Sequence, residues 1–303
     1  DCTFGGGGYS KQLLKFSKTI VNGIDRDNKV KAIGKKLEKS FPKRFKFFQT
    51  KFSQLDKIIK DQVDTIIFDL GLSSIQLDDH ERGFSFKSNK NLDMSMGLNK
   101  ISAQDAINNL SELELKLIIK IFGEEKEAAR IAKNIVKSRN KKKIVKVKEL
   151  VDIIEKSKKK KYGTKINPST KTFQAIRIFV NKEITELING IINATKILKP
   201  GGKLLIVSFH SIEDKIVKYF FSNFSSNKPK PSRYLPTQEE NSIALFNEYK
   251  NKVFKPSDRE ISQNYRSRSA KLRYATRSKN EFYIPDELSK KFKIYLDLEA
   301  IDV

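Results

Sequence analysis

The stretch Asp1-Cys2-Thr3-Phe4-Gly5-Gly6-Gly7-Gly8-Tyr9-Ser10 decides how the chain is expected to fold. Its four consecutive glycines stand directly before residues 11–16, which are compatible with a helix. Glycine has no Cβ and adopts positive φ without steric cost, so the backbone of such a turn can approach a ligand closely. The stretch therefore predicts a loop that holds a cofactor at the start of a helix.

An acid at the end of a short apolar stretch supports this prediction. Residues 19–25, TIVNGID, read as a strand that ends at Asp25. In a doubly wound sheet, an acid about 20 residues after the glycine loop reaches the hydroxyls of a nucleoside ribose. The glycines do not follow the G-x-G-x-x-G order of dinucleotide-binding loops, which favours a nucleoside cofactor without a pyrophosphate over NAD. A structural turn is the alternative.

The composition indicates a basic protein with a polyanionic partner. The 303 residues are 38% hydrophobic, which suffices for a core. Lysine and arginine together number 61 against 36 acids, giving a formal net charge of +25. A surplus of this size favours nucleic acid as the partner, although part of it can reflect the abundance of lysine, isoleucine and asparagine.

Residues that bind metals or form disulfides are scarce. The chain contains one cysteine, Cys2, and two histidines, His80 and His210. We therefore expect neither a disulfide nor a zinc site, and an intracellular, cytoplasmic location. No apolar run approaches the roughly 20 residues that cross a bilayer. Because the chain starts without methionine inside the glycine motif, we expect a first strand of the sheet to precede Asp1.

Three further apolar stretches read as strands, at residues 45–48, 64–69 and 203–209. Each follows a stretch compatible with a helix, so the pattern predicts βαβ units and a largely parallel sheet. Ligands bind at the carboxyl ends of the strands in such sheets. The polar and aromatic residues at or just beyond these ends are Asp25, Phe52, Asp69, Ser73 and His210.

A long interval separates two of these strands. The 133 residues between Asp69 and Lys203 are too many for one crossover. Within them, residues 102–105 (SAQD) and 111–114 (SELE) have the spacing of helix capping boxes. The interval therefore predicts an inserted helical subdomain at residues 100–168, which recognises the substrate. The expected core consists of residues 1–99 and 169–303.

Two polar stretches and one long helix complete the expected organisation. The lysine-rich run at 156–163 favours a solvated loop over a phosphate contact. Residues 222–262 favour a mobile excursion that orders on RNA. Residues 172–198 have helical periodicity and predict one long helix, which the breakers at 199–202 (KPGG) end.

Four stretches resemble the ribosomal RNA small-subunit methyltransferase H family. They are residues 1–10, 69–86 (DLGLSSIQLDDHERGFSF), 172–178 (TFQAIRI) and 208–214 (SFHSIED), and the similarity continues through 264–273 (NYRSRSAKLR). Members of this family are class I methyltransferases that use S-adenosylmethionine to methylate N4 of a cytidine in the decoding region of 16S rRNA.

The resemblance carries expectations about the fold and the partners. It implies an α/β fold with a doubly wound, mostly parallel, Rossmann-like methyltransferase sheet and the inserted helical subdomain. It implies S-adenosylmethionine as cofactor and 16S rRNA within the small ribosomal subunit as partner.

The resemblance also implies a cofactor site at the sheet edge, formed by Gly7, Gly8, Tyr9, Asp25, Phe52, Asp69 and Gln76. In it, the glycine loop lies at the methionine end, Asp25 at the ribose and Phe52 beside the adenine. The residue types agree for Asp25, whose two oxygens can accept from two hydroxyls, and for Phe52, whose ring can face a base. Core packing is the alternative for Phe52, and capping of the following turn is the alternative for Asp69.

Methylation of an exocyclic cytosine amine needs hydrogen-bond acceptors, because the nitrogen shares its lone pair with the ring. The candidate acceptors are Asp69, the Ser73 hydroxyl and the backbone carbonyls of residues 71–74. The sequence has no Pro-Pro of the kind found in DNA amino methyltransferases. His210 directly follows a predicted strand and could bond the base or accept a proton near neutral pH. Helix capping is an equal alternative for His210, and His80 is expected to be structural.

Basic residues in the second half of the chain are candidate contacts to RNA phosphates. The candidates are Lys171, Arg177, Lys182, Arg266, Arg268 and Arg273. Tyr265 or Phe84 could stack on an extruded base. Each of these residues has an alternative as a surface or core residue. Where the family has arginine, this chain has Ser95 and Lys171, and lysine lacks the planar fork that binds phosphate at two points.

Two other functions stay open from the sequence. A small-molecule methyltransferase would keep the glycine loop without needing the basic surplus. A noncatalytic RNA-binding or ribosome-assembly protein would keep the charge without needing Asp25 and residues 69–76 together.

Overall fold

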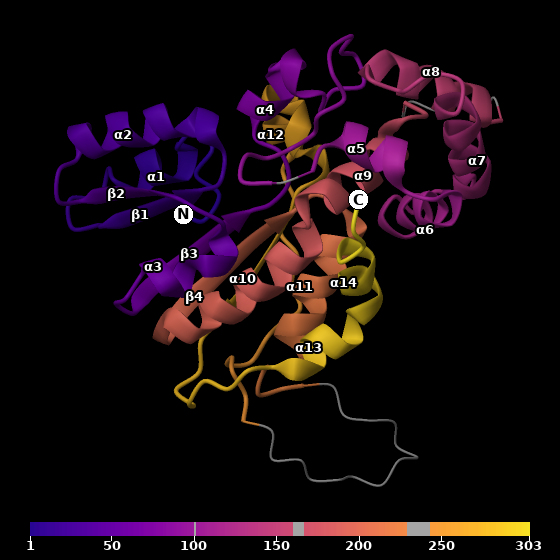
Figure 1. The fold of residues 1–303 in the computed structure, drawn as a ribbon. Coiled ribbons are helices and arrows are strands. Elements are labelled where there is room, and N and C mark those ends of the chain that lie inside the picture. The colour runs from indigo at the N-terminus through magenta and orange to yellow at the C-terminus, as the bar shows by residue number, and fades with distance from the viewer. Residues whose placement is uncertain (100, 160–166, 229–242) are drawn as a thin grey trace, which may run out of the picture. The chain divides into compact units, whose positions relative to one another are not determined.

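The computed structural model describes residues 1–99, 101–159, 167–228 and 243–303 (Figure 1). The chain forms two compact units, each built from segments that are distant in sequence. Unit 1 comprises Asp1–Asp25, Lys29–Gly71 and Glu186–Phe292. Unit 2 comprises Arg26–Asn28, Leu72–Thr185 and Lys293–Val303.

Unit 1 contains the strands. β1 (Val21–Asp25) pairs in parallel with β2 (Phe45–Gln49). β4 (Leu198–Ser208) lies between β3 (Val63–Asp69), to which it is parallel, and β5 (Lys271–Thr276), to which it is antiparallel. Three consecutive residues of β3, Ile66 to Phe68, are buried, as is typical of a strand covered on both faces.

The segment from Asp1 to Phe4 lies between β1 and β3. Cys2 donates its N–H to the Ile67 carbonyl of β3 at 2.9 Å, and Phe4 donates to the Ile24 carbonyl of β1 at 2.9 Å. Ile24 in turn donates to the Asp1 carbonyl at 2.8 Å. The first four residues therefore connect the two groups of strands at their centre, and the glycines leave from the carboxyl edge.

Helices cover the strands of unit 1. Its α-helices are α1 (Gly8–Leu13), α2 (Lys31–Ser40), α3 (Leu55–Ile58), α10 (Glu183–Ile197), which begins in unit 2, α11 (Ser211–Asn223), α12 (Asp258–Gln263) and α13 (Asp286–Lys291). The 3-10 helices in the described part of the chain are η1 (Asn28–Val30), η2 (Phe52–Gln54), η3 (His80–Arg82) and η4 (Tyr265–Ser269). On α11, Phe220 is fully buried and packs edge-on against Phe246 with ring centroids 5.3 Å apart.

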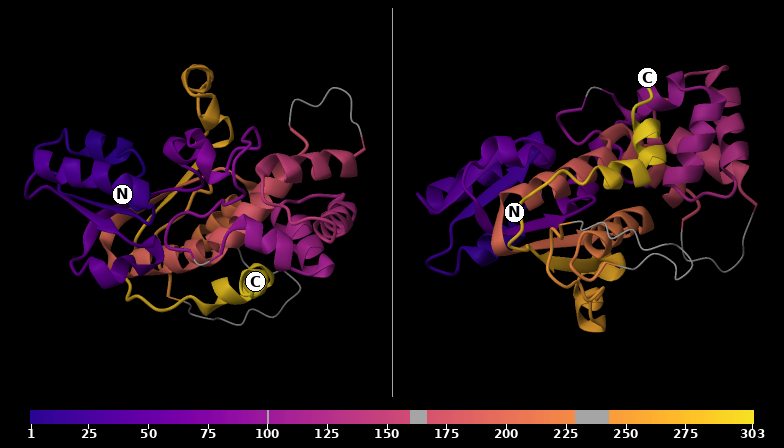
Figure 2. Two further views of the ribbon diagram at one scale, coloured as in Figure 1. Left: turned by 45° about the horizontal axis from the view of Figure 1, so that its top comes forward. Right: turned by 90° about the horizontal axis from the view of Figure 1, so that it is seen from below.

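Unit 2 is helical in its described residues. Its helices are α4 (Ser74–Asp78), α5 (Ala103–Asn109), α6 (Glu112–Phe122), α7 (Ala128–Arg139), α8 (Val147–Ser157), α9 (Thr170–Asn181) and α14 (Lys293–Glu299). Both predicted capping boxes are confirmed, at Ser102 with Asp105 and at Ser111 with Glu114. Buried isoleucines and leucines join α6, α7 and α8, which stay grouped in every view (Figure 2).

The structure corrects several predicted elements. α1 begins at Gly8 and ends at Leu13, earlier than the predicted helix at 11–16. The predicted helix at 172–198 is two helices, because Lys182 adopts a left-handed φ of 49° between α9 and α10. Residues 199–202 belong to β4, where Gly201 has a φ of 80° and the register with β3 shifts. The antiparallel strand β5 was not predicted.

The boundaries of the parts also differ from those expected. Unit 2 contains the described residues of the predicted insertion and extends beyond it on both sides. Residues 160–163 of the lysine-rich run and 229–242 of the predicted excursion lie outside the described residues. Among the helices that the structure describes, none is long and apolar enough to span a membrane.

The aromatic cluster around α11 predicts a large stability difference between two phenylalanines. Phe220→Ala removes a fully buried ring and leaves a cavity, so we expect a loss of about 3 to 5 kcal/mol in the free energy of unfolding. Phe16→Ala is the matched control, because Phe16 is 70% exposed and its replacement should leave stability almost unchanged. Urea unfolding of both variants measures the difference, and equal losses would contradict the packing described for α11.

Candidate active site

The glycine loop leads from the centre of the sheet into α1. Gly5 and Gly7 have left-handed φ values of 49° and 75°, and Gly7 is the N-cap of the helix. A Cβ at Gly7 would lie 2.8 Å from the Phe4 ring, so both the backbone angle and the space require glycine there. At Gly8 a Cβ would meet no heavy atom within 4 Å, so the backbone at this position faces open space.

Asp25 ends β1 and is tied to the glycine loop. Its Oδ2 accepts a hydrogen bond from the Gly5 N–H at 2.8 Å. The carboxylate predicted to hold a ribose therefore lies beside the turn predicted to hold the rest of the cofactor, and both are in unit 1.

Asp69 ends β3 on the same edge. Its N–H donates to Thr3 Oγ1 at 2.7 Å, whereas its Oδ1 is buried and has no hydrogen-bond partner among the described residues. Burial raises the pKa of the Asp69 carboxyl to about 6, and the negative charge of Glu213 adds to the rise. A buried acceptor without a partner is costly, so this oxygen marks a place where a donor from a ligand would fit.

Tyr9 lies in the first turn of α1 and is half-exposed. Partial burial raises the pKa of the Tyr9 phenol to about 12, and the negative charges of Asp69 and Glu260 contribute. The phenol is therefore neutral at physiological pH and can donate a hydrogen bond.

Phe52 begins η2, which follows β2. Its half-buried ring packs edge-on against Phe68, with ring centroids 5.0 Å apart. A Cβ at Gly190 of α10 would lie 2.6 Å from the same ring, so α10 approaches closely because it has glycine there. The core contact is present, and adenine stacking on Phe52 stays a prediction.

Ser73 and Gln76 belong to unit 2, where they form the capping box of α4. Ser73 donates its N–H to Gln76 Oε1 at 2.9 Å, and Gln76 donates its N–H to Ser73 Oγ at 3.3 Å. Gln76 Nε2 also donates to Asp27 Oδ2 at 2.7 Å, and the same oxygen accepts from Arg82. The sequence did not indicate the pairing of Asp27 with Arg82, because two buried opposite charges can be recognised only once their burial is known.

His210 is the N-cap of α11. Its Nδ1 accepts the Glu213 N–H at 3.4 Å, while its Nε2 lies 3.1 Å from Glu213 Oε1 without forming a hydrogen bond. The side chain is 7% exposed. Of the two open interpretations, helix capping is therefore present, and a role toward the substrate base stays a prediction.

The comparison with known sequences identifies the family. A sequence model described as the MraW methylase family matches residues 1–278. The chain belongs to this family.

Curated relatives of this MraW methylase are similar over most of their length. The chain is 43% identical over 286 residues to "Ribosomal RNA small subunit methyltransferase H" of Bartonella grahamii, covering 94% of this chain and 85% of the relative. Relatives of the same name from Bartonella bacilliformis and Ehrlichia canis are 44% and 43% identical, each over 278 residues. The matches cover 92% and 90% of this chain and 83% and 91% of those relatives.

Two of the basic residues predicted to contact phosphate are engaged inside the methylase. Arg273 on β5 is 4% exposed and bonds Asp214 at 2.7 Å, and it also donates to Tyr249 and Asn251 at 3.0 Å. Arg177 makes two bonds to the Glu183 carboxylate, at 2.8 and 3.0 Å. These partners disfavour a phosphate contact at either arginine and give both a role in the fold.

Other predicted RNA residues lie at the surface. Arg266 and Arg268 are exposed on η4, and the Arg268 guanidinium stacks 4.3 Å from the Tyr265 ring centroid. Lys171 is exposed and donates to the Glu124 carbonyl at 2.9 Å, and Lys182 is exposed at the end of α9. Of the two aromatic candidates, Tyr265 is exposed, whereas Phe84 is buried beneath Arg82. Ser95, where the family has arginine, donates to Asp93 at 3.0 Å.

The two kinds of arginine predict different effects on stability. Arg273→Ala leaves the carboxylate of Asp214 without its main partner in a mostly buried place, so we expect a loss of about 3 kcal/mol. Arg268→Ala removes an exposed arginine and should leave the free energy of unfolding almost unchanged. Chemical denaturation of both variants tests this, and a stable Arg273→Ala protein would show that Arg273 has no structural role.

Proposed function

We propose that this MraW methylase transfers a methyl group from S-adenosylmethionine to N4 of a cytidine in the decoding region of 16S rRNA. The observation that carries the proposal is the identity of about 43% with rRNA small-subunit methyltransferases over 94% of the chain. The edge of unit 1 supports it, because the glycine loop, Asp25 and Asp69 lie on adjacent segments of one sheet edge. The enzyme would act in the cytoplasm, where ribosomal subunits are assembled.

The order of strands supports a doubly wound methyltransferase sheet. Hydrogen bonds join β2 to β1, β1 to the segment from Asp1 to Phe4, this segment to β3, and β3 through β4 to β5. The strands that follow the Asp1–Phe4 segment thus extend the sheet first on one side of it, with β1 and β2, and then on the other, with β3, β4 and β5. In such sheets, ligands bind at the carboxyl edge beside the segment where the strand order reverses. Gly8, Asp25 and Phe52 would hold the cofactor there, with the ribose at Asp25 and the adenine at Phe52.

When bound, S-adenosylmethionine would supply an electrophilic methyl group, and positioning of the amine in line with it would provide much of the rate. The N4 nitrogen is a weak nucleophile because its lone pair is delocalised into the cytosine ring. Asp69 Oδ1, which is buried and has no partner among the described residues, would accept a hydrogen bond from an N4 hydrogen. This contact returns electron density to the nitrogen, and the carboxylate can take up the proton that the methylated amine releases. Ser73 and His210 are further candidates for acceptors.

Recognition of the rRNA would involve the helical insertion at 100–168 and the exposed basic residues of η4. The candidates for phosphate contacts that the structure leaves at the surface are Arg266, Arg268, Lys171 and Lys182. The alternatives of a small-molecule methyltransferase and a noncatalytic assembly factor are disfavoured by relatives that are named as rRNA methyltransferases.

Methyl transfer to intact subunits tests the proposal directly. Labelled S-adenosylmethionine and small subunits from cells that lack the enzyme are incubated with the protein, and the labelled nucleoside is mapped. We expect one N4-methylated cytidine in the decoding region. Label at another position would overturn the proposed site, and unlabelled rRNA would overturn the proposed reaction.

Asp25 is expected to control cofactor affinity. Asp25→Ala removes a charged acceptor for ribose hydroxyls, worth about 1.5 to 3 kcal/mol, so the Kd for S-adenosylmethionine should rise about tenfold to a hundredfold. Asp61→Ala, which changes an exposed acid of unit 1, is the control. Calorimetric titration measures both constants, and unchanged affinity in Asp25→Ala would remove the residue from the cofactor site.

Asp69 is expected to set the pH dependence of methyl transfer. Because its folded pKa is raised to about 6, the carboxyl is mostly protonated below that pH, where it is a weaker acceptor and cannot take up the proton that the amine releases. The single-turnover rate should therefore rise as pH increases through about 6 and level off above about 7. Asp69→Asn should be slower and should lose this inflection. An Asp69→Asn profile with the same inflection as the wild type would assign the titration to another group.

A further inference from the structure

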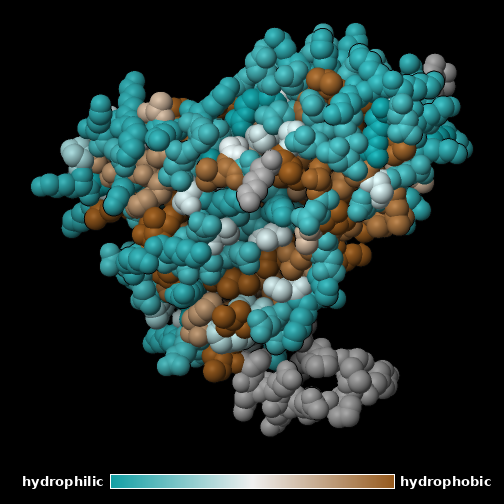
Figure 3. Space-filling view, viewed as in Figure 1, coloured by the Kyte–Doolittle hydropathy of each residue, from teal (hydrophilic) through white to brown (hydrophobic). Residues whose placement is uncertain are grey.

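Unit 2 carries a dense basic segment in addition to the residues considered so far. Residues 130–148 contain nine lysines and arginines and no acid. They run along α7, through the following loop and into α8, and their lysines are exposed. The surface over these helices is mostly hydrophilic in Figure 3. A concentration of one sign of charge attracts a polyanion.

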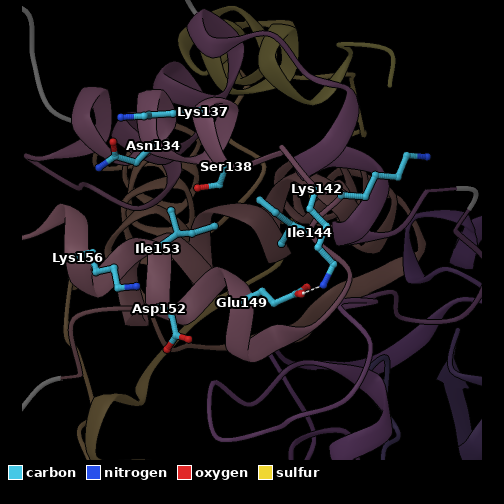
Figure 4. A pocket seen from close by; sticks show the side chains of 10 residues that line it. Asn134, Lys137, Ser138, Lys142, Ile144, Glu149, Asp152, Ile153 and Lys156 are labelled. Atoms are coloured by element: carbon cyan, nitrogen blue, oxygen red, sulfur yellow. Dashed lines mark hydrogen bonds and ion pairs between the residues drawn. The ribbon is translucent and has the colours of Figure 1, made fainter. Parts of the chain in front are cut away.

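The segment borders a groove between α7 and α8 with a volume of about 460 Å³. Lys137 comes from α7, Lys142 and Lys143 from the loop, and Lys156 from α8. Figure 4 shows Asn134, Lys137 and Ser138 of α7 on one side and Glu149, Asp152 and Lys156 of α8 on the other, with the Ile153 side chain between the two sets. Four lysines from three segments thus line one concave surface.

The acids of the groove cancel only part of this charge. Glu149 accepts the N–H groups of Lys146 and Val145, both at 2.9 Å, and the Lys142 ammonium at 3.1 Å. These bonds lower the pKa of the Glu149 carboxyl to about 2, the backbone bond from Lys146 contributing most. Glu149 is thus a helix cap that neutralises Lys142.

Apart from the pair of Lys142 with Glu149, the groove lining contains three lysines and one acid. Within the described ranges, Lys137, Lys143 and Lys156 form no ion pair, and Asp152 is the remaining acid of the lining. Outside the lining, Asp105 is close enough to Lys143 for this lysine to help lower the pKa of the Asp105 carboxyl. The groove keeps a net positive charge, in a concave place where neighbouring groups focus the field.

We infer that this groove binds the sugar-phosphate backbone of the rRNA substrate, at a site separate from the methylated base. The inference rests on the proposed function, which supplies the polyanion. The lining has lysines and two isoleucines but no aromatic ring, so it is suited to phosphate contacts that position RNA and not to base stacking. The groove therefore raises affinity for the subunit without taking part in methyl transfer.

A triple substitution tests the charge of the groove. Lys137→Gln, Lys143→Gln and Lys156→Gln remove three cations and keep long side chains that suit helices. The control triple is Lys31→Gln, Lys36→Gln and Lys39→Gln, which removes the same charge from exposed positions of α2. The dissociation constant for unmethylated small subunits is measured across a series of salt concentrations, without S-adenosylmethionine.

The salt dependence gives the expected result. Losing three phosphate contacts should lower the slope of log K against log salt by about 2 to 3 and weaken binding about tenfold or more at low salt. The control triple should keep the slope of the wild type. A groove triple that matches the wild type, or a control triple with the same loss, would overturn the inference.

A variant that is expected to tighten binding excludes damage to the fold as the explanation for weaker binding by the groove triple. Asp152→Asn removes the remaining acid of the groove, so binding to the subunit should tighten about twofold to fivefold. Unchanged or weaker binding would count against phosphates in the groove.

Kinetics separate this inference from the proposed function. The groove triple should raise KM for subunits about tenfold and change kcat less than twofold, because phosphate contacts here hold substrate and transition state equally. An equal fall in kcat would place the groove in the chemical step and overturn the inference. If the wild type bound subunits through the groove but transferred no methyl, the proposed reaction would fail while the groove remained.

Discussion

The hydrogen bonds of the segment from Asp1 to Phe4 are the constraint on which the candidate site depends. This segment bonds to β1 on one side and to β3 on the other, and it ends where the glycine turn begins. The glycine turn, Asp25 and Asp69 therefore start from three adjacent points of one sheet edge. Main-chain pairing brings them together, although they lie up to 64 residues apart in sequence. The set of groups that meet at this sheet edge is therefore a consequence of strand order.

Local signals in the sequence predicted much of this arrangement. The strands at β1, β2 and β3 and the capping boxes at Ser102 and Ser111 depend on neighbours within a few residues, so their patterns are visible in the chain itself. The antiparallel strand β5 depends on pairing with β4, more than 60 residues earlier, and has no such pattern. The break at Lys182 depends on a backbone conformation that helical periodicity does not reveal.

The candidate site shows the same division between local and distant information. The position of Asp69 after a strand was enough to suggest chemistry, whereas the partner of Arg273 is an aspartate 59 residues away. The sequence does not distinguish an exposed arginine from a buried one. Arg268 on η4 is a surface charge, whereas Arg273 on β5 is a buried structural group. Buried Arg273 has oxygen partners on several sides, while Asp69 keeps one buried oxygen that no described residue bonds. Such an exception to polar pairing is expected where function needs a reactive group.

The bond between Asp25 and Gly5 holds the carboxylate in place before any ligand arrives. Ordering a mobile side chain on binding costs about 0.5 to 1.5 kcal/mol, and a side chain that folding has already ordered avoids most of this cost. In the proposed cofactor site, Asp25 would thus be preorganised for the ribose by its bond to the glycine turn. Under this proposal cofactor affinity is linked to local stability, because loosening of the glycine turn would free the Asp25 carboxylate without altering its chemistry.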